Sequence, residues 1–148
     1  MAETQVLSAP HFMEFPYTRS TGPVVGAFLT GLRDRKVLGA KDSTGRVVVP
    51  PMEYDEFTAA ATQADALVPV SDEGVVTSWS WNPKPRAGQP FEQPFAWALV
   101  QLDGADTGLL HALDAPRESI RTGMRVRIRW AEETVGFIND IQCFEPVA

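Results

Sequence analysis

The sequence FAWALVQL at residues 95–102 is followed by the polar segment DGADT at 103–107 and by GLLHAL at 108–113. The first segment is apolar enough for a β-strand that is buried on both faces. The second combines Asp and Gly, which favour a tight turn, and the third has the length of another strand. Residues 95–113 therefore predict two consecutive antiparallel strands joined by a turn.

Further short strands are predicted on both sides of this pair. The sequence RVRIRW at 125–130 alternates strictly, which predicts that Val126, Ile128 and Trp130 face the interior. Short antiparallel strands without repeated strand–helix units favour a small closed barrel, because closure removes exposed strand edges. An OB-fold is the natural candidate at this size. The predicted strands are residues 66–70, 75–81, 95–102, 108–113, 125–130 and 138–144.

A long loop at residues 82–94 contains four prolines and separates two aromatic-rich strands. Stiff aromatic loops can dock to a partner with little loss of conformational entropy. Basic residues in the same loop are candidate contacts for an anionic ligand, such as a nucleotide 3′-phosphate. The candidate docking residues here are Trp79, Trp81, Phe91 and Phe95, and the candidate anion contacts are Lys84 and Arg86.

The N-terminal part of the chain has a different pattern. Residues 1–20 are irregular yet rich in large apolar groups, and such an arm packs either on its own domain or on a partner. Helical spacing predicts one helix over 21–36, capped by Thr21, with an apolar face. A hairpin turning at 42–45 and a short helix at 54–61 follow. The apolar candidates for partner contact in the arm and helix are Phe12, Phe15, Tyr17, Phe28 and Leu32.

Composition restricts the classes of function. The 148 residues have a formal net charge of −6, which disfavours general nucleic-acid binding. Cys143 is the one cysteine, so neither an internal disulfide nor a four-cysteine zinc site is expected. The N-terminus lacks a signal-peptide pattern, and no apolar run approaches the roughly 20 residues that span a bilayer. A cytoplasmic protein without a membrane partner is therefore expected.

No catalytic motif is evident, and no catalytic residue is predicted. His111 lies in an apolar strand, where a packed histidine competes with a substrate-contacting one. Cys143 is expected to be a buried, inert thiol. Asp140 interrupts the last predicted strand, so that it either satisfies backbone groups or has a functional role. The outward row Arg125, Arg127 and Arg129 is expected to pair with acidic neighbours rather than to bind phosphate.

Four segments in a characteristic order carry a resemblance to a known family. They are TGRVVVPP at 44–51, EGVVTSW at 73–79, PFAWALVQLDG at 94–104 and TGMRV at 122–126. Within residues 25–146 the chain resembles the domain-of-unknown-function-35 (DUF35) family, in which a rubredoxin-like zinc ribbon precedes an OB-fold. The resemblance divides the chain into an arm and helix at 1–36, a degenerate ribbon at 37–63 and an OB-fold barrel at 64–148.

The chain departs from that family at the expected zinc site. The family's two Cys-x2-Cys pairs would fall on Lys41 and Thr44 and near Tyr54 and Phe57, none of which is Cys or His. A tetrahedral zinc site needs such ligands. We therefore expect no metal and no other cofactor, and a ribbon held together by packing of Val47, Val49, Tyr54 and Phe57.

The resemblance implies a function as a partner subunit. DUF35 proteins commonly accompany thiolase-fold enzymes, and DGADT at 103–107 and DIQCF at 140–144 look like the subgroup that partners a lipid-transfer-protein-like thiolase in steroid side-chain degradation. That resemblance implies a retro-aldolase cleaving a β-hydroxy acyl-CoA into a ketone and propionyl-CoA or a similar short acyl-CoA. It also implies two copies of each chain, with the acyl-CoA bound mainly by the partner.

Two alternatives remain open from the sequence. One is a stand-alone OB-fold that binds single-stranded nucleic acid through exposed aromatics. The other is a small-molecule carrier or an independent hydrolase that uses His111 and Asp140.

Overall fold

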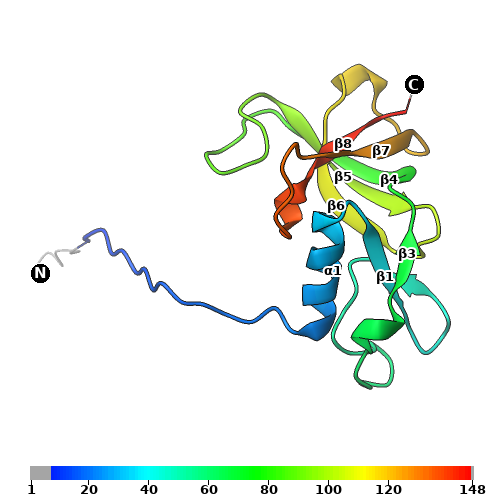
Figure 1. Cartoon of the computed structure of the whole chain (residues 1–148). Helices are drawn as coiled ribbons and strands as arrows, with labels where there is room; N and C mark the ends of the chain where they lie inside the picture. The colour runs from blue at the N-terminus through cyan, green and yellow to red at the C-terminus, as the bar shows by residue number, and fades with distance from the viewer. Residues whose placement is uncertain (1–7, 148) are drawn as a thin grey trace, which may run out of the picture.

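The computed structural model describes residues 8–147. Within this range the chain has one α-helix, α1 (Pro23–Arg33), and is otherwise mainly β (Figure 1). The strands are β1 (Val37–Lys41), β2 (Val47–Val48), β3 (Val68–Val70), β4 (Glu73–Asn82), β5 (Phe95–Leu102), β6 (Gly108–Leu113), β7 (Arg125–Trp130) and β8 (Ile141–Pro146), and the 3-10 helices are η1 (Ala64–Ala66), η2 (Arg117–Ser119) and η3 (Ile138–Asp140).

Five strands form a closed barrel in the order β4-β5-β6-β8-β7. The barrel closes because β4 pairs with both β5 and β7, and its one parallel contact joins Leu113 of β6 to Phe144 of β8. This is the five-stranded barrel of an OB-fold. The predicted fold class is therefore confirmed.

Alternation along β5 explains how the barrel interior is filled. Ala96, Ala98 and Val100 are fully buried, whereas Leu99 between them is 38% exposed. The expectation that this strand is buried on both faces is therefore wrong over its middle, where the outer face reaches solvent. Gly74 of β4 lies against the backbone of Gln101, where a Cβ atom would collide with the carbonyl oxygen, so the close approach of β4 to β5 requires glycine.

A small second sheet, in the order β2-β1-β3, packs beside the barrel together with α1 (Figure 1). The strand predicted at 66–70 belongs to this sheet, because Val68–Val70 pairs with β1. Phe28, Leu32, Val37 and Val49 share one buried cluster with the barrel residues. The helix, the small sheet and the barrel thus have a common core.

The bounds of α1 differ from the predicted 21–36. Its N-cap is Gly22 and not Thr21, and glycine has no side chain that could accept a capping hydrogen bond. Instead the Glu53 carboxylate accepts hydrogen bonds from the N–H groups of Val24 and Val25, at 3.0 and 2.9 Å. A negative charge at a helix N-terminus is favourable. The helix predicted at 54–61 is absent from this part of the structure, where turns and an isolated bridge between Tyr54 and Ala61 occur.

Candidate partner-binding site

The N-terminal arm is the most exposed apolar segment of the described chain. It runs extended away from α1 into solvent (Figure 1), and its side chains Phe12, Met13, Phe15 and Tyr17 are 90%, 70%, 72% and 83% exposed. The sequence left open whether this arm packs on its own domain. Over residues 8–20 it does not, although residues 1–7 of the predicted arm lie outside the described range.

The predicted contact residues of the helix are oriented differently. Phe28 is 3% exposed and Leu32 is fully buried, and both belong to the main core. Neither side chain reaches the surface of this structure, so the expectation that they contact a partner does not fit. Their helical spacing marked a buried face, and the face packs on the chain's own sheet and barrel.

The aromatic residues around loop 82–94 largely pack on the chain itself. Phe95 is 3% exposed and stacks edge-on against Trp97, with ring centroids 5.1 Å apart. Phe91 covers Phe95 at 5.4 Å, so the loop forms a small satellite core on the outside of the barrel. Trp79 and Trp81 are half-buried against the main core. Of these four side chains Phe95 is buried, and the other three are partly exposed, so their predicted partner contacts stay a prediction.

The basic residues of this loop lie on its surface. Lys84 and Arg86 are both exposed, and no ion pair involves either of them within residues 8–147. Their predicted contact with a CoA phosphate stays a prediction.

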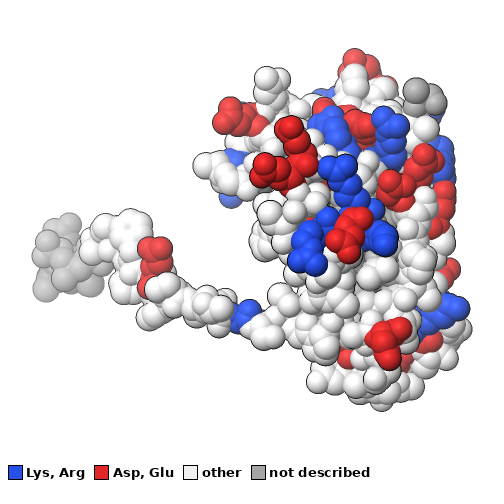
Figure 2. Space-filling view, viewed as in Figure 1, with Lys and Arg blue, Asp and Glu red and all other residues white. Residues whose placement is uncertain are grey.

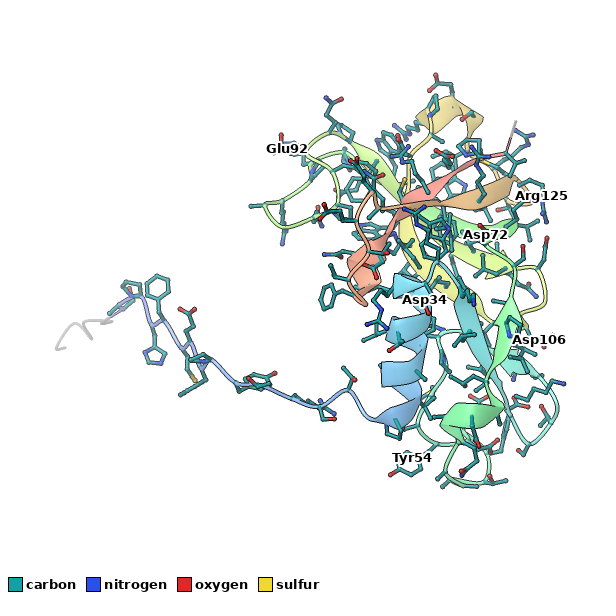
Figure 3. The ribbon with its side chains drawn as sticks, in the orientation of Figure 1. Asp34, Tyr54, Asp72, Glu92, Asp106 and Arg125 are labelled. Atoms are coloured by element: carbon teal, nitrogen blue, oxygen red, sulfur yellow. The ribbon has the colours of Figure 1, made fainter. Side chains whose placement is uncertain are left out.

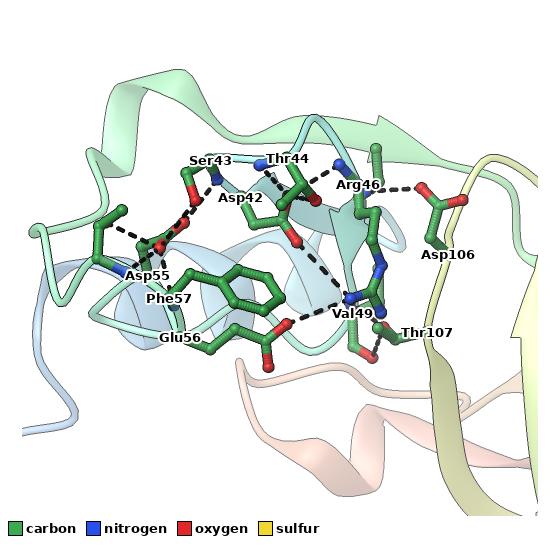
Figure 4. A network of polar contacts seen from close by, with 12 residues as sticks. Asp42, Ser43, Thr44, Arg46, Val49, Asp55, Glu56, Phe57, Asp106 and Thr107 are labelled. Atoms are coloured by element: carbon green, nitrogen blue, oxygen red, sulfur yellow. Dashed lines mark hydrogen bonds and ion pairs between the residues drawn. The ribbon is translucent and has the colours of Figure 1, made fainter.

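Hydrogen bonds to two aspartates hold together the ribbon segment where relatives are expected to carry zinc (Figure 4). The Asp55 carboxylate accepts bonds from the N–H groups of Ser43, Phe57 and Thr58, at 2.6, 3.0 and 2.7 Å. It therefore links the turn after β1 to the turn at 55–58. Hydrogen bonding by the Ser43 and Thr58 N–H groups lowers the pKa of this carboxyl well below its ordinary range.

The second aspartate, Asp42, stabilises the first turn alone. Its Oδ1 accepts bonds from the N–H groups of Thr44 and Arg46, at 2.8 and 2.9 Å. These bonds form an Asx-type turn, for which the sequence signal is Asp-Ser-Thr-Gly at 42–45. Sequence reasoning identified the turn there but missed the Asp55 carboxylate, which links it to the turn at 55–58.

The expected packing in the ribbon is partly wrong. Val49 is 1% exposed, but Tyr54 and Phe57 are 63% and 61% exposed and point outward (Figures 3 and 4). The degenerate positions Lys41 and Thr44 lie at the end of β1 and in the following turn. No group of three or more His, Cys, Asp or Glu side chains between residues 8 and 147 is arranged to hold a metal ion.

The turn at 103–107 joins the ribbon to the barrel. The Asp106 carboxylate accepts a hydrogen bond of 2.7 Å from the Val47 N–H (Figure 4). The Thr107 hydroxyl accepts one from the Val49 N–H and donates one to the Val49 carbonyl, at 2.7 and 2.9 Å. This turn, predicted only as a connection between two strands, therefore also positions β2.

The outward arginines of β7 are paired with carboxylates, as expected. Arg125 contacts Asp103 and Glu73, Arg127 contacts Glu145, and Arg129 contacts Asp114 and Glu145. In Figure 2 basic and acidic side chains are interspersed over this part of the barrel. Such pairing reduces the attraction of this strand for phosphate and for a nucleic-acid backbone.

The remaining candidates for chemistry are enclosed. Cys143 is fully buried, and burial raises the pKa of its thiol to about 11, so it is a poor nucleophile at neutral pH. Asp140 is 2% exposed and accepts bonds from the N–H groups of Val135, Gly136 and Phe137. Of the two roles that the sequence left open for Asp140, satisfying backbone groups accounts for its geometry.

His111 is 7% exposed and meets Phe144 edge-on, with ring centroids 6.3 Å apart. Burial lowers the pKa of its imidazole, which favours the neutral form.

No helix in the described part of the chain is both long and apolar enough to cross a membrane.

Comparisons with known proteins agree with this architecture. Residues 67–131 match the family model described as the C-terminal OB-fold domain of ChsH2. A DUF35-family protein of unknown function from Sulfolobus solfataricus has 28% sequence identity and a TM-score of 0.58, over 73% of this chain and 78% of that one. The structure described as Ltp2-ChsH2(DUF35) aldolase has 20% identity and a TM-score of 0.63, over 87% of this chain and 98% of that one, a likeness of fold.

No match was found among curated protein sequences. Residues 67–131 are thus similar to the C-terminal OB-fold domain of ChsH2, and the resemblance of the chain to the DUF35 family is confirmed.

Proposed function

We propose that this protein is a non-catalytic accessory subunit of a thiolase-like acyl-CoA complex. The proposed complex is a retro-aldolase that cleaves a β-hydroxy acyl-CoA side chain of a steroid. The Cα–Cβ bond breaks, the β-hydroxyl becomes a ketone, and the enolate of the short acyl-CoA takes up a proton. The proposed partner is a lipid-transfer-protein-like thiolase-fold chain, with two copies of each subunit.

The observation that carries this proposal is the exposed aromatic arm. Three aromatic side chains within six residues, Phe12, Phe15 and Tyr17, are each more than 70% exposed. Exposed apolar clusters of this kind mark interaction sites, because covering them removes apolar surface from water. An extended arm can lie along a second protein over a larger area than a compact loop can, which suits a stable subunit contact.

The likeness to the structure described as Ltp2-ChsH2(DUF35) aldolase supports the kind of partner. That likeness extends over 87% of this chain and 98% of that one. The site geometry is consistent with a non-catalytic role. Retro-aldol cleavage needs a base at the β-hydroxyl and hydrogen-bond donors at the thioester oxygen, whereas Asp140 is fully occupied by backbone donors.

The test is co-purification followed by reconstitution. The tagged full-length chain is recovered from its native cell extract, and we expect a thiolase-like protein to accompany it. Retro-aldolase activity, followed as the release of short acyl-CoA, is expected from the mixture and not from this chain alone. Recovery of this chain without a thiolase-like protein would contradict the proposal.

The arm is tested by two matched sets of substitutions. The first is Phe12→Ser with Phe15→Ser and Tyr17→Ser, and the control is Glu14→Ala with Thr18→Ala. All five residues lie in the exposed arm, so neither set is expected to change the melting temperature. We expect the first set to weaken binding of the thiolase-like protein at least tenfold and the control to leave it unchanged. Equal binding by both sets would show that the arm is not the contact.

A further inference from the structure

A cleft of about 510 Å³ opens on the outside of the barrel, between loop 82–94, strand β6 and the η3–β8 segment. In Figure 1 the loop and the η3 segment lie on the same side of the barrel. The volume falls in the range of small-molecule sites. The apolar walls of the cleft are formed by Trp97, Leu110 and Ile138. The Leu110 side chain is 61% exposed, because no other described group covers it.

A buried histidine lines this cleft. His111 is more than nine-tenths buried, and its Nδ1 atom has no hydrogen-bond partner in the structure. A buried polar atom without a partner costs free energy. Because burial lowers the pKa of His111, the ring is neutral at neutral pH and offers one donor and one acceptor.

Two glutamine amides in the cleft are fixed in orientation. The Oε1 atom of Gln89 accepts bonds from Asn82 Nδ2 and from the Arg86 N–H, both at 2.9 Å. The Oε1 atom of Gln142 accepts a bond of 3.1 Å from Arg129 Nε. With both oxygens engaged, the Nε2 groups remain as donors toward a ligand. Asp, Glu, Lys and Arg are absent from the residues that line the cleft.

The geometry points to a binding site for an uncharged, mainly apolar small molecule with a carbonyl or hydroxyl oxygen. The apolar body contacts Trp97 and Leu110, and the oxygen accepts hydrogen bonds from the amide groups of Gln142 and Gln89. A carboxylate or phosphate is disfavoured, because no cation in the cleft compensates its desolvation. This inference does not depend on the proposed partner, because the barrel and its loop form the whole cleft.

The test is titration of the full-length chain with prodan, a neutral fluorescent ketone whose emission reports the polarity around its carbonyl. We expect saturable binding of one molecule per chain with a blue-shifted emission. The substitution Gln142→Glu keeps an oxygen acceptor for Arg129 but replaces the amide donor by a charged oxygen. The substitution Leu110→Glu places a negative charge on the apolar wall of the cleft. Each is expected to weaken binding at least tenfold.

The matched control is Met52→Glu, which places the same charge on an exposed apolar position of the ribbon, outside the residues that line the cleft. Its affinity is expected to stay within twofold of the wild type, and the anion 2-naphthoate is expected not to displace the probe. Met52, Leu110 and Gln142 are all exposed, and a thermal melt monitored by circular dichroism checks that each variant folds. Non-saturable binding, or wild-type affinity of Gln142→Glu, would overturn the assignment.

Discussion

Replacing Asp140 by alanine is expected to destabilise the protein strongly, because this carboxylate organises the loop between β7 and β8. It accepts three hydrogen bonds, from the Val135, Gly136 and Phe137 N–H groups, at 2.9, 2.7 and 3.1 Å. The same loop contacts α1, since the Thr134 hydroxyl donates to the Arg33 carbonyl at 2.7 Å. Loss of Asp140 therefore loosens the loop and its contact with the helix.

The magnitude follows from the bonds that are lost. A hydrogen bond to a charged group contributes about 1.5–3 kcal/mol, and water can replace some of the three bonds because the loop lies at the surface. We therefore expect the free energy of unfolding to fall by about 2–4 kcal/mol. For a chain of this size this lowers Tm by roughly 5–15 °C. Urea unfolding and differential scanning calorimetry at pH 7 measure both quantities.

The dependence on pH identifies the charge as the cause. Burial by itself would raise the pKa of Asp140, but hydrogen bonding by the three N–H groups outweighs it and holds the pKa below its ordinary value. A lowered folded pKa contributes stability that is complete above about pH 4 and is lost as the pH falls toward the folded value. Asp140→Asn does not titrate, so its deficit relative to the wild type should shrink below about pH 4.

Two results would refute this reasoning. One is a wild-type melting temperature for Asp140→Ala at pH 7. The other is a deficit for Asp140→Asn that stays constant from pH 7 to pH 3. The neighbouring exposed residue provides the control, and Asn139→Ala is expected to change stability little.

Two further predictions concern the ribbon and the buried thiol. Asp55→Ala should speed amide hydrogen exchange at Ser43 and Thr58, because their N–H groups lose their acceptor. Exchange at Val100 in the barrel should stay unchanged. Uniform acceleration would mean that Asp55 does not act locally. The Cys143 thiol should resist Ellman's reagent at pH 8 in the native state, because burial raises its pKa to about 11. In denaturant it should react with one equivalent of the reagent. Rapid labelling of the native protein would show that the thiol is accessible.

The bounds of β5, β6 and β7 could be predicted from local pattern, because these strands show their burial directly in the sequence. The strand predicted at 138–144 begins instead at Ile141, because residues 138–140 form η3. The range 125–130 alternates between arginines and apolar residues, and β7 covers that range with its arginines outward. The ranges 95–102 and 108–113 also coincide with strands, and Asp103–Asp106 connects them. Alternation is a property of neighbouring residues, so no distant contact is needed to recognise it.

The candidate site was less predictable, because exposure depends on what else folds against a side chain. Phe12 and Phe28 are the same residue type and were both predicted to contact a partner, yet one is 90% exposed and the other 3%. Phe28 is buried because α1 packs on β1 and the barrel. The same holds for Tyr54 and Phe57, which are exposed, whereas hydrogen bonds to Asp55 link the turns around them.

The sequence by itself determined a small β-barrel and the limits of β5, β6 and β7, since local period encodes both. The resemblance to a known family added a ribbon whose expected zinc positions are neither Cys nor His. The tertiary structure alone decided that Val68–Val70 pairs with β1 instead of joining the barrel, and that Asp55 links two turns. It also decided that the middle of β5 is buried on its inner face and exposed on its outer face. Each depends on contacts between residues distant in the chain, whose free energies local propensity does not contain.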